Sequence, residues 1–348
     1  MKKINVLNKY DIIIERGLLA DCGSQIRGVT KAQTAAIVTD DNVSAFYLDT
    51  VSRSLNNAGF DVCTFVFPHG EENKNIRTVM EMVDFFAKNG LTRSDIAVAL
   101  GGGVCGDMCG FAAAIYLRGI SFVQIPTSLL AQVDSSVGGK TGCDLDCGKN
   151  LVGAFHHPSL VLIDPDTLST LPEKYMADGM GEVIKYGCIR SKELFSRLLN
   201  SENYENIDDI IYECVKIKAD IVEKDFTEQN ERMLLNFGHT VGHAIEKVED
   251  FCGMSHGMAV GVGMVMITDA AEKEGLTEKG TADSIRALLK KYGMPTETEH
   301  GTGDISRAAM SDKKRRSDTL NIVLIKDIGE GYVHKIKCDR LDGFLGGK

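Results

Sequence analysis

Short apolar runs alternate with longer amphipathic stretches through the first half of the chain. Residues 35–39, 61–67, 96–100, 122–125 and 160–163 form runs rich in β-branched and other apolar residues. The segments between them carry apolar positions at helical spacing. This alternation predicts a parallel sheet built from βαβ units.

From about Pro172 the pattern becomes almost wholly helical. Helical spacing of apolar residues covers 176–189, 192–199, 208–222, 231–248 and 258–274. A strand signal returns only at 321–325 and 332–336, which predicts a terminal hairpin. We therefore predict an α/β domain over residues 1–171 and a mainly helical domain over residues 172–348.

Composition and charge narrow the class of protein. The chain of 348 residues has a formal net charge of −10, which disfavours broad contact with nucleic acid or an anionic membrane. No apolar run approaches the ~18 residues of a membrane span, and no signal-peptide pattern follows the first residues, so we predict a cytoplasmic protein. In that compartment the ten cysteines are expected to be reduced thiols. The close pairs Cys105/Cys109 and Cys143/Cys147 lack the zinc-type C-x2-C spacing.

A glycine-rich loop follows the predicted strand at 96–100. The segment Gly101-Gly102-Gly103-Val104-Cys105-Gly106-Asp107 leads into a helical pattern, and a helix N-terminus after such a loop binds phosphate groups. It matches G-x-G-x-x-G, but no acidic residue follows about 20 positions later, so the ordinary dinucleotide fingerprint is not met. Asp40 and Glu71 also follow predicted strands, where carboxylates can accept hydrogen bonds from ribose hydroxyls.

The stretch from 126 to 150 is also rich in glycine and hydroxyl residues. Thr127, Ser128, Asp134, Lys140 and Lys149 lie in it, and two lysines in such a loop suit a phosphorylated ligand. The sequence at 138–141 lacks the G-x4-G-K-[ST] spacing, so a P-loop nucleotide hydrolase is not predicted.

The helical half supplies candidates for a metal site. His239 and His243 are spaced i, i+4 on one face of a predicted helix, and spacing alone pairs these two. His256 opens the next helical segment, and Glu182 lies upstream. Two histidines, a carboxylate and an open position are typical of catalytic zinc. Basic residues in the same motifs indicate a doubly anionic substrate: Arg118, Lys185, Lys218, Arg232, Lys313 and Lys314.

Taken in order between about residues 35 and 325, these motifs resemble the 3-dehydroquinate synthase family of sugar-phosphate cyclases. The resemblance implies an α/β NAD-binding domain followed by an all-α metal-binding domain, in a cytoplasmic homodimer of the shikimate pathway. The implied reaction converts 3-deoxy-D-arabino-heptulosonate 7-phosphate to 3-dehydroquinate and phosphate. In that family NAD oxidises a hydroxyl transiently, phosphate is eliminated, the hydride returns and an intramolecular aldol step closes the ring. The matching motifs are Gly70-Glu71-x-x-Lys74, the loop at 101–107, Arg118-Gly119, Pro126-Thr127-Ser128, 134–141, Gly148-Lys149-Asn150, 181–185, 236–243 and His256-Gly257.

The resemblance also implies roles for individual residues. Zinc, or cobalt in its place, would be bound by Glu182, His239 and His256, which leaves His243 facing the substrate. Asp134 and Lys185 would orient neighbouring groups. The phosphate and carboxylate of the substrate would be held by Arg118, Lys140, Lys218, Arg232, Asn236 and Lys313 or Lys314. NAD would contact Asp40, Asn42, Glu71, Lys74, Gly103, Val104, Cys105, Gly106, Asp107, Thr127, Ser128, Lys140, Lys149, Thr167, Leu168, Ser169 and Thr170.

Three alternatives remain open at this point. A second sugar-phosphate cyclase, such as a 2-deoxy-scyllo-inosose synthase, would share the fold, NAD and metal but differ around the substrate. A metal-dependent glycerol dehydrogenase would release its oxidised product, although the basic residues favour a phosphorylated substrate. A catalytically inactive NAD-binding protein would have lost the metal or basic residues, and these are present.

Overall fold

The computed structural model describes residues 1–225, 231–310 and 318–347. It divides into two compact units, Met1–Pro172 and Glu173–Lys348. Within the described ranges, none of the helices combines the length and apolar character needed to cross a membrane.

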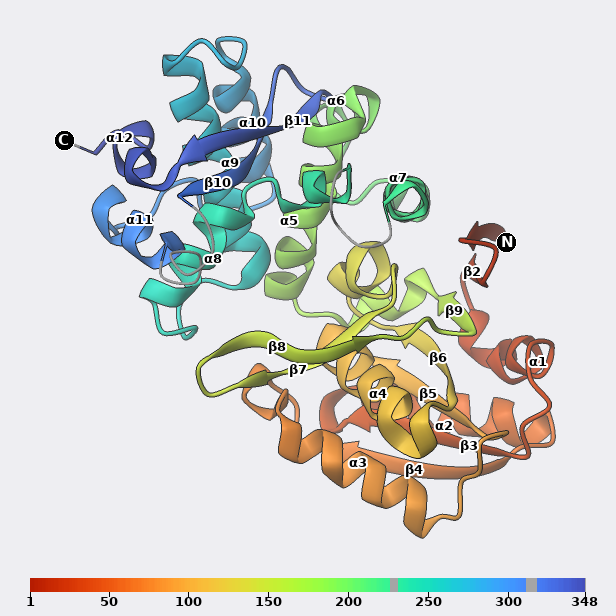
Figure 1. Ribbon diagram of the computed structural model, residues 1–348. Helices are drawn as coiled ribbons and strands as arrows, with labels where there is room; N and C mark the ends of the chain where they lie inside the picture. Colours follow the sequence, from red (N-terminus) through yellow and green to blue (C-terminus); the bar gives the residue numbers. More distant parts are fainter. Residues whose placement is uncertain (226–230, 311–317, 348) are drawn as a thin grey trace. The chain divides into compact units, whose positions relative to one another are not determined.

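Unit 1 is built on a seven-stranded sheet with the order β1-β2-β9-β6-β5-β3-β4 (Figure 1). The five predicted strands are all present and pair in parallel, which confirms the α/β prediction. The inner strand β5 is buried along its whole length, so it carries an unbroken apolar run. The strands are β1 (Lys2–Val6), β2 (Tyr10–Ile14), β3 (Thr34–Asp40), β4 (Asp61–Phe67), β5 (Ile96–Gly101), β6 (Ser121–Pro126) and β9 (Leu160–Ile163).

Helices cover both faces of this sheet. Along β3, Ile37 packs with α1 and α2, whereas Val38 packs with α3 and α4 on the opposite face. Successive side chains of a strand point to opposite faces, so one buried strand contributes to both core layers. The helices are α1 (Cys22–Arg27), α2 (Asp41–Asn57), α3 (Ile76–Lys88) and α4 (Gly103–Ile115), with short turns η1 (Leu18–Asp21), η2 (Glu71–Asn73), η3 (Tyr116–Arg118) and η5 (Pro165–Thr170).

The glycine-rich stretch after β6 forms an element that the sequence did not predict. A single π-helical turn, η4 (Ala131–Ser135), precedes an antiparallel hairpin of β7 (Lys140–Leu145) and β8 (Gly148–Phe155). This hairpin packs against α4 (Figure 1). Gly142 and Gly153 face each other across it, and a Cβ at Gly153 would lie 2.1 Å from the carbonyl oxygen of Thr141. The glycines therefore let the two strands lie unusually close.

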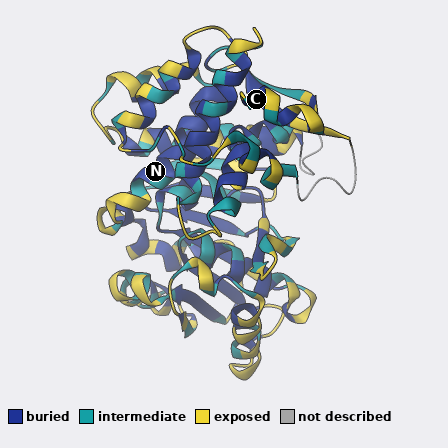
Figure 2. Ribbon diagram, turned by 90° about the vertical axis from the view of Figure 1, so that its left-hand side faces the viewer, coloured by how far each residue is buried: buried dark blue, intermediate teal, exposed yellow. Residues whose placement is uncertain are grey.

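The described residues of unit 2 form helices and one hairpin. The hairpin of β10 (Thr319–Ile325) and β11 (Gly331–Lys337) confirms the predicted terminal pair. Helices α5 and α9 are largely buried. Figure 2 marks buried residues in dark blue. The helices are α5 (Glu173–Arg190), α6 (Lys192–Asn200), α7 (Ile207–Lys224), α8 (His239–Val248), α9 (His256–Lys273), α10 (Thr281–Lys291), α11 (Thr302–Met310) and α12 (Leu341–Phe344), with turns η6 (Glu231–Asn236) and η7 (Cys338–Arg340).

The prediction of one helix over 231–248 is wrong. The segment divides into η6 and α8 at Gly238, whose φ of 78° lies in the left-handed region. A Cβ at this position would lie 2.6 Å from both Met264 Cγ and the carbonyl oxygen of Val260 on α9. The break therefore lets the chain approach α9 closely and makes His239 the first residue of a new helix.

Candidate functional site

The glycine loop of unit 1 joins the end of β5 to the start of α4. Gly102 precedes the helix in an extended conformation, and its Cβ would lie 3.3 Å from Ser128 Oγ. A Cβ at Gly103 would lie 3.1 Å from Ser135 Oγ, and one at Gly106 would lie 2.9 Å from Gln124 Oε1. The loop backbone therefore lies against the chain that follows β6. The amides of the first turn of α4 suit a bound phosphate.

Cys105 and Val104, both predicted cofactor contacts, lie in the first turn of α4. The thiol of Cys105 is buried and donates to the carbonyl oxygen of Val38 at 3.2 Å. Burial raises the pKa of Cys105 well above its usual value, so the group stays a neutral thiol. Because the side chain of Cys105 packs in the core beside the sheet, only its backbone can contact a ligand.

Asp40 lies at the carboxyl end of β3 and caps α2. Its Oδ1 accepts from the backbone amides of Asn42 at 3.0 Å and Val43 at 2.9 Å. Its Oδ2 would lie 3.5 Å from a Cβ at Gly101, so this second oxygen faces the glycine loop. Burial raises the pKa of Asp40, although the two amide bonds oppose that effect. One carboxylate oxygen is thus fixed by the helix while the other faces the loop.

Lys74 ties three segments of unit 1 together. Its ammonium donates to Asp107 Oδ2 and to Asn150 Oδ1, both at 2.7 Å, and the residue is only 5% exposed. Burial alone would lower the pKa of Lys74, but the charges of Asp107 and Glu71 outweigh it and raise the pKa. Lys74 therefore stays charged and holds the loop at Glu71, the first turns of α4 and strand β8 in one arrangement.

The segment η5 carries four predicted cofactor contacts and is anchored by its hydroxyl groups. Thr167 Oγ1 accepts from Gln132 Nε2 at 3.0 Å, and Thr170 Oγ1 lies 2.5 Å from the hydroxyl of Tyr47 on α2. Leu168 is buried, while Ser169 is exposed and donates to the carbonyl oxygen of Asp166. Nearby, the Thr127 amide donates to the carbonyl oxygen of Gly101, which joins β6 to the glycine loop.

Four charged candidates in unit 1 lie outside these contacts. Lys140 is exposed at the start of β7, and Lys149 on β8 and Asp134 in η4 are half-buried. Arg118 is exposed and has a φ of 68°, directly after Leu117 with a φ of 50°. Two successive non-glycine residues in the left-handed region indicate local backbone strain at Arg118.

The metal candidates of unit 2 come from three helices. Glu182 lies on α5, and His239 and His256 are the first residues of α8 and α9. The Nε2 atoms of both histidines lie 3.6 Å from Glu182 Oε1. This oxygen is buried and accepts no hydrogen bond among the described residues. A buried carboxylate oxygen facing two imidazole nitrogens matches the donor set of zinc.

Both histidines are oriented through their other ring nitrogen. His239 Nδ1 lies 3.1 Å from the carbonyl oxygen of Phe237, and His256 Nδ1 lies 3.4 Å from Glu246 Oε2. With Nδ1 of each ring at an acceptor, the Nε2 atoms face Glu182 and are the nitrogens that a metal ion would bind. His243 is exposed, and its ligand nitrogen lies within 4.8 Å of those of His239 and His256. The structure therefore brings together all four residues that the sequence proposed.

The charges around Glu182 have defined effects. Burial alone would raise the pKa of Glu182, but the ion-paired ammonium of Lys185 and the two histidines hold it well below its usual range. Burial and the Lys185 charge lower the pKa of His239. Burial also opposes protonation of His256, yet Glu182 and Glu246 raise its pKa to about 10. The cluster thus keeps an ionised carboxylate in a buried setting.

Glycines set the spacing of the helices that carry these donors. A Cβ at Gly181 would lie 2.4 Å from the carbonyl oxygen of Gly257, and one at Gly257 would lie 1.9 Å from that of Asp178. The Gly257 amide also donates to Asp178 Oδ1 at 2.7 Å, which caps the start of α9. Glu182 and His256 each adjoin one of these glycines in sequence.

The remaining basic candidates of unit 2 are mostly buried. Lys218 on α7 and Arg232 in η6 are buried, and the Arg232 amide donates to Asp225 Oδ2 at 3.1 Å. Asn236 is half-buried at the end of η6. Lys313 and Lys314 lie outside the described residues.

Two acidic residues near the metal candidates were missed from the sequence. Glu246 contacts His256, and Asp178 binds the first turn of α9. Glu246 follows His239 and His243 at helical spacing, which is a signal that could have found it. Asp178 carries no such signal, because its partner is distant in sequence.

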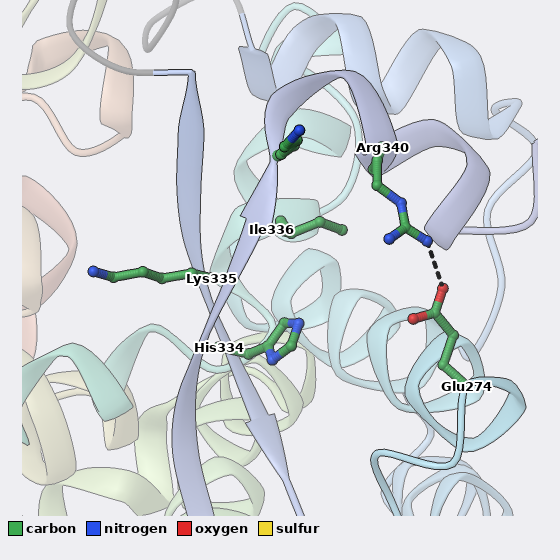
Figure 3. Close-up of a pocket in the computed structure, with 6 residues that line it drawn as sticks. Glu274, His334, Lys335, Ile336 and Arg340 are labelled. Carbon is green, nitrogen blue, oxygen red and sulfur yellow. Dashed lines mark ion pairs between the residues drawn. The ribbon is translucent and has the colours of Figure 1, made fainter.

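A separate cavity of about 240 Å³ lies at the terminal hairpin (Figure 3). Arg340 pairs with Glu274 there at 3.6 Å, and Lys335 points away from this pair (Figure 3). None of the predicted site residues lines it. The lining residues are Glu274, His334, Lys335, Ile336, Lys337 and Arg340.

Comparison with known proteins gives consistent matches over both units. Residues 64–178 match the family described as 3-dehydroquinate synthase N-terminal, and residues 179–315 match 3-dehydroquinate synthase C-terminal. The chain is 51% identical over 338 residues to a 3-dehydroquinate synthase from Clostridium perfringens (strain 13 / Type A), covering 95% of this chain and 97% of that protein.

Two solved structures share the fold over nearly the whole chain. One is a 2-deoxy-scyllo-inosose synthase complexed with carbaglucose-6-phosphate, NAD+ and Co2+, with a TM-score of 0.88, 25% identity and coverage of 99% and 98% of the two chains. The other is a 2-epi-5-epi-valiolone synthase from Streptomyces hygroscopicus subsp. jinggangensis 5008 with NAD+ and Zn2+ bound. Its TM-score is 0.86, with 25% identity and coverage of 99% and 97%.

Proposed function

Because the chain belongs to the 3-dehydroquinate synthase family, we propose that it converts 3-deoxy-D-arabino-heptulosonate 7-phosphate to 3-dehydroquinate and phosphate. The observation that supports this most directly is the convergence of Glu182, His239 and His256 from three helices of unit 2. The reaction is that of a carbon–oxygen lyase acting on a phosphate. We also propose, from the family resemblance, a cytoplasmic homodimer in the shikimate pathway that binds neither nucleic acid nor membranes.

NAD and a divalent metal, zinc or cobalt, are the proposed cofactors, as in the two related structures. Unit 1, proposed as the NAD-binding domain, offers the amides at the start of α4, the loop-facing oxygen of Asp40 and the assembly held by Lys74. NAD held there would supply reversible hydride transfer, so that no net oxidation of the substrate results. The assigned contacts are those given by the resemblance, with Cys105 contributing only its backbone.

Glu182, His239 and His256 are the proposed metal ligands in unit 2. A divalent metal held by these residues would supply Lewis-acid polarisation of the hydroxyl to be oxidised. The Phe237 carbonyl and Glu246 hold the two imidazole rings with Nε2 directed towards Glu182. Lys185, paired with Glu182, keeps that carboxylate ionised and therefore able to bind a cation.

The basic residues are assigned to the anionic groups of the substrate. Lys218 and Arg232 are buried, so their interactions with a phosphate or carboxylate are weakly screened by water. Such contacts fix the substrate so that its reacting carbon and departing phosphate are correctly placed. His243 is exposed beside the proposed metal ligands, and we assign it to the substrate. The same role is proposed for Arg118, Lys140, Asn236 and Lys313 or Lys314, with Asp134 as an orienting group.

A second candidate function is another sugar-phosphate cyclase activity. The match to 2-deoxy-scyllo-inosose synthase supports it, because that structure covers 99% of this chain. That match has 25% identity, however, against 51% for the Clostridium perfringens 3-dehydroquinate synthase. The set Lys218, Arg232, Asn236 and His243 also favours the carboxylate-bearing substrate. A glycerol dehydrogenase-like activity would not require these cations.

The test is to follow phosphate release and 3-dehydroquinate formation from the heptulosonate phosphate with NAD at trace levels. We expect many turnovers per NAD, loss of activity on chelation and recovery with zinc. His300→Gln serves as a control that should retain activity, because His300 pairs with Glu249 and with none of the proposed ligands. Turnover of glucose 6-phosphate alone would favour the second cyclase, and stoichiometric accumulation of NADH would indicate a dehydrogenase.

A further inference from the structure

Glu246 is a buried carboxylate beside the proposed metal site. It lies on α8 and is 2% exposed, with its Oε2 3.4 Å from His256 Nδ1. Isolated carboxylates are rarely buried, because removing a negative charge from water is costly unless it is compensated. The contact with the imidazole of His256 provides such compensation on the side of the ring that faces away from Glu182.

The two proposed histidine ligands differ in what holds them. His239 Nδ1 is close to a neutral acceptor, the carbonyl of Phe237, within its own turn of chain. His256 instead has a charged acceptor supplied by a different helix. Donation to a carboxylate makes the opposite nitrogen of an imidazole a stronger metal ligand than donation to a carbonyl does. Of the two histidines, His256 is therefore the one whose affinity for a metal ion depends on a side chain of another helix, that of Glu246.

The backbone at His256 is fixed independently of its ring. Asp178 accepts the Gly257 amide at 2.7 Å, and the close contact between Gly181 and Gly257 holds α9 against α5. These contacts set where α9 begins but leave the side-chain torsions of His256 undetermined. Glu246 reaches the Nδ1 side of the ring and so adds to the contact of Nε2 with Glu182 a constraint on the ring's rotation and on which nitrogen carries the proton.

We propose that Glu246 is a positioning residue that orients His256 and strengthens it as a ligand for a divalent metal ion. This inference rests on the proposed function, because it assumes the metal site at Glu182, His239 and His256. Glu246 touches neither substrate nor cofactor in this role. Its effect is transmitted through the imidazole of His256.

The experiment measures metal affinity directly. Metal-free wild type, Glu246→Gln, Glu246→Asp and Glu249→Gln are titrated with zinc against a chromophoric chelator, and with Co²⁺ while its visible absorption is recorded. Glu249→Gln is the matched control, because Glu249 lies just after α8 and pairs with a histidine, His300 at 3.2 Å, that is not a proposed ligand. Thermal unfolding of each metal-free variant separates folding from binding.

We expect Glu246→Gln to bind zinc about 10- to 100-fold more weakly, the usual cost of removing an outer carboxylate partner. Its Co²⁺ absorption should change, while Glu249→Gln keeps wild-type affinity and spectrum. Glu246→Asp, with its carboxylate withdrawn by one methylene, should also bind more weakly and supplies the test if the glutamine variant does not fold. Wild-type zinc affinity and an unchanged Co²⁺ spectrum in the Glu246 variants would overturn the role of Glu246 but not the proposed metal site. Failure of the wild type to bind either metal would overturn both it and the proposed metal site.

Discussion

Replacement of Gly181 by alanine should move a proposed metal ligand without altering any donor atom. The new Cβ would lie 2.4 Å from the carbonyl oxygen of Gly257 and 2.8 Å from its Cα. Both contacts are with backbone, so no flexible side chain can move aside. The substitution therefore tests whether the distance between α5 and α9 sets the geometry of Glu182 and His256.

The size of the effect follows from the contact. A carbon–oxygen contact relaxes at about 3.3–3.6 Å, so α5 and α9 must separate locally by about 1 Å. Such overpacking costs about 1–3 kcal/mol of unfolding free energy, offset in part by up to about 1 kcal/mol from the better helix propensity of alanine. Metal–ligand distances tolerate only about 0.2 Å, and a displacement of about 1 Å can lower a rate about 100-fold. We therefore expect a large functional loss with a modest loss of stability.

The assay combines zinc titration, turnover and urea unfolding of the metal-free protein. Gly187→Ala is the control on the same helix, because its Cβ would lie 3.1 Å from Phe195 Cβ and near no proposed ligand. We expect Gly181→Ala to lose at least about 10-fold in zinc affinity and about 100-fold in turnover. Gly187→Ala should lose stability only. Wild-type zinc affinity and turnover in Gly181→Ala would refute the argument that this contact positions the ligands.

Two further predictions concern unit 1. Lys74→Met should lower the unfolding free energy by about 3 kcal/mol in urea titrations, because it leaves Asp107 without its buried cation. Adding Asp107→Asn should recover part of that loss. An unchanged unfolding free energy in Lys74→Met would contradict a stabilising role for the Lys74–Asp107 pair. The hydrogen bond and charge of Asp41 raise the pKa of His69 above its ordinary 6.5. The His69–Asp41 ion pair therefore stabilises the fold fully below pH 6.5, and this contribution is lost as the pH rises through the raised pKa of His69. An NMR titration of the His69 ring should show the raised pKa in the wild type and a pKa closer to 6.5 in Asp41→Asn. Equal pKa values of His69 in the wild type and in Asp41→Asn would contradict the pairing.

The sheet of unit 1 was predictable because its buried parallel strands are continuous apolar runs. Strand β5 shows this most clearly, since it is buried from end to end. The hairpin β7–β8 escaped prediction because glycines such as Gly142 and Gly153 weaken the strand pattern and are typical of loops. Their role is to permit close approach of two strands, a tertiary requirement that local patterns do not reveal.

The metal candidates show a similar limit. Helical spacing could relate His239 only to its neighbour His243, because periodicity reports contacts within one helix. The approach of Glu182 and His256 depends on contacts between helices, including that of Gly181 with Gly257. The family resemblance supplied this set of residues, and the break at Gly238 that starts α8 had no local signal strong enough to interrupt the predicted helix.

The contacts of Lys74 make the proposed nucleotide site depend on the folding of all of the segments that Lys74 joins. Its partners Asp107 and Asn150 lie 33 and 76 positions away along the chain, so the arrangement exists only when these distant segments have all docked. A nucleotide that binds only this arrangement would stabilise the folded unit by about 2.7 kcal/mol at a concentration 100 times its dissociation constant. Partly folded chains would gain nothing. The supply of NAD would then control how long unit 1 survives proteases, in addition to its role in the reaction.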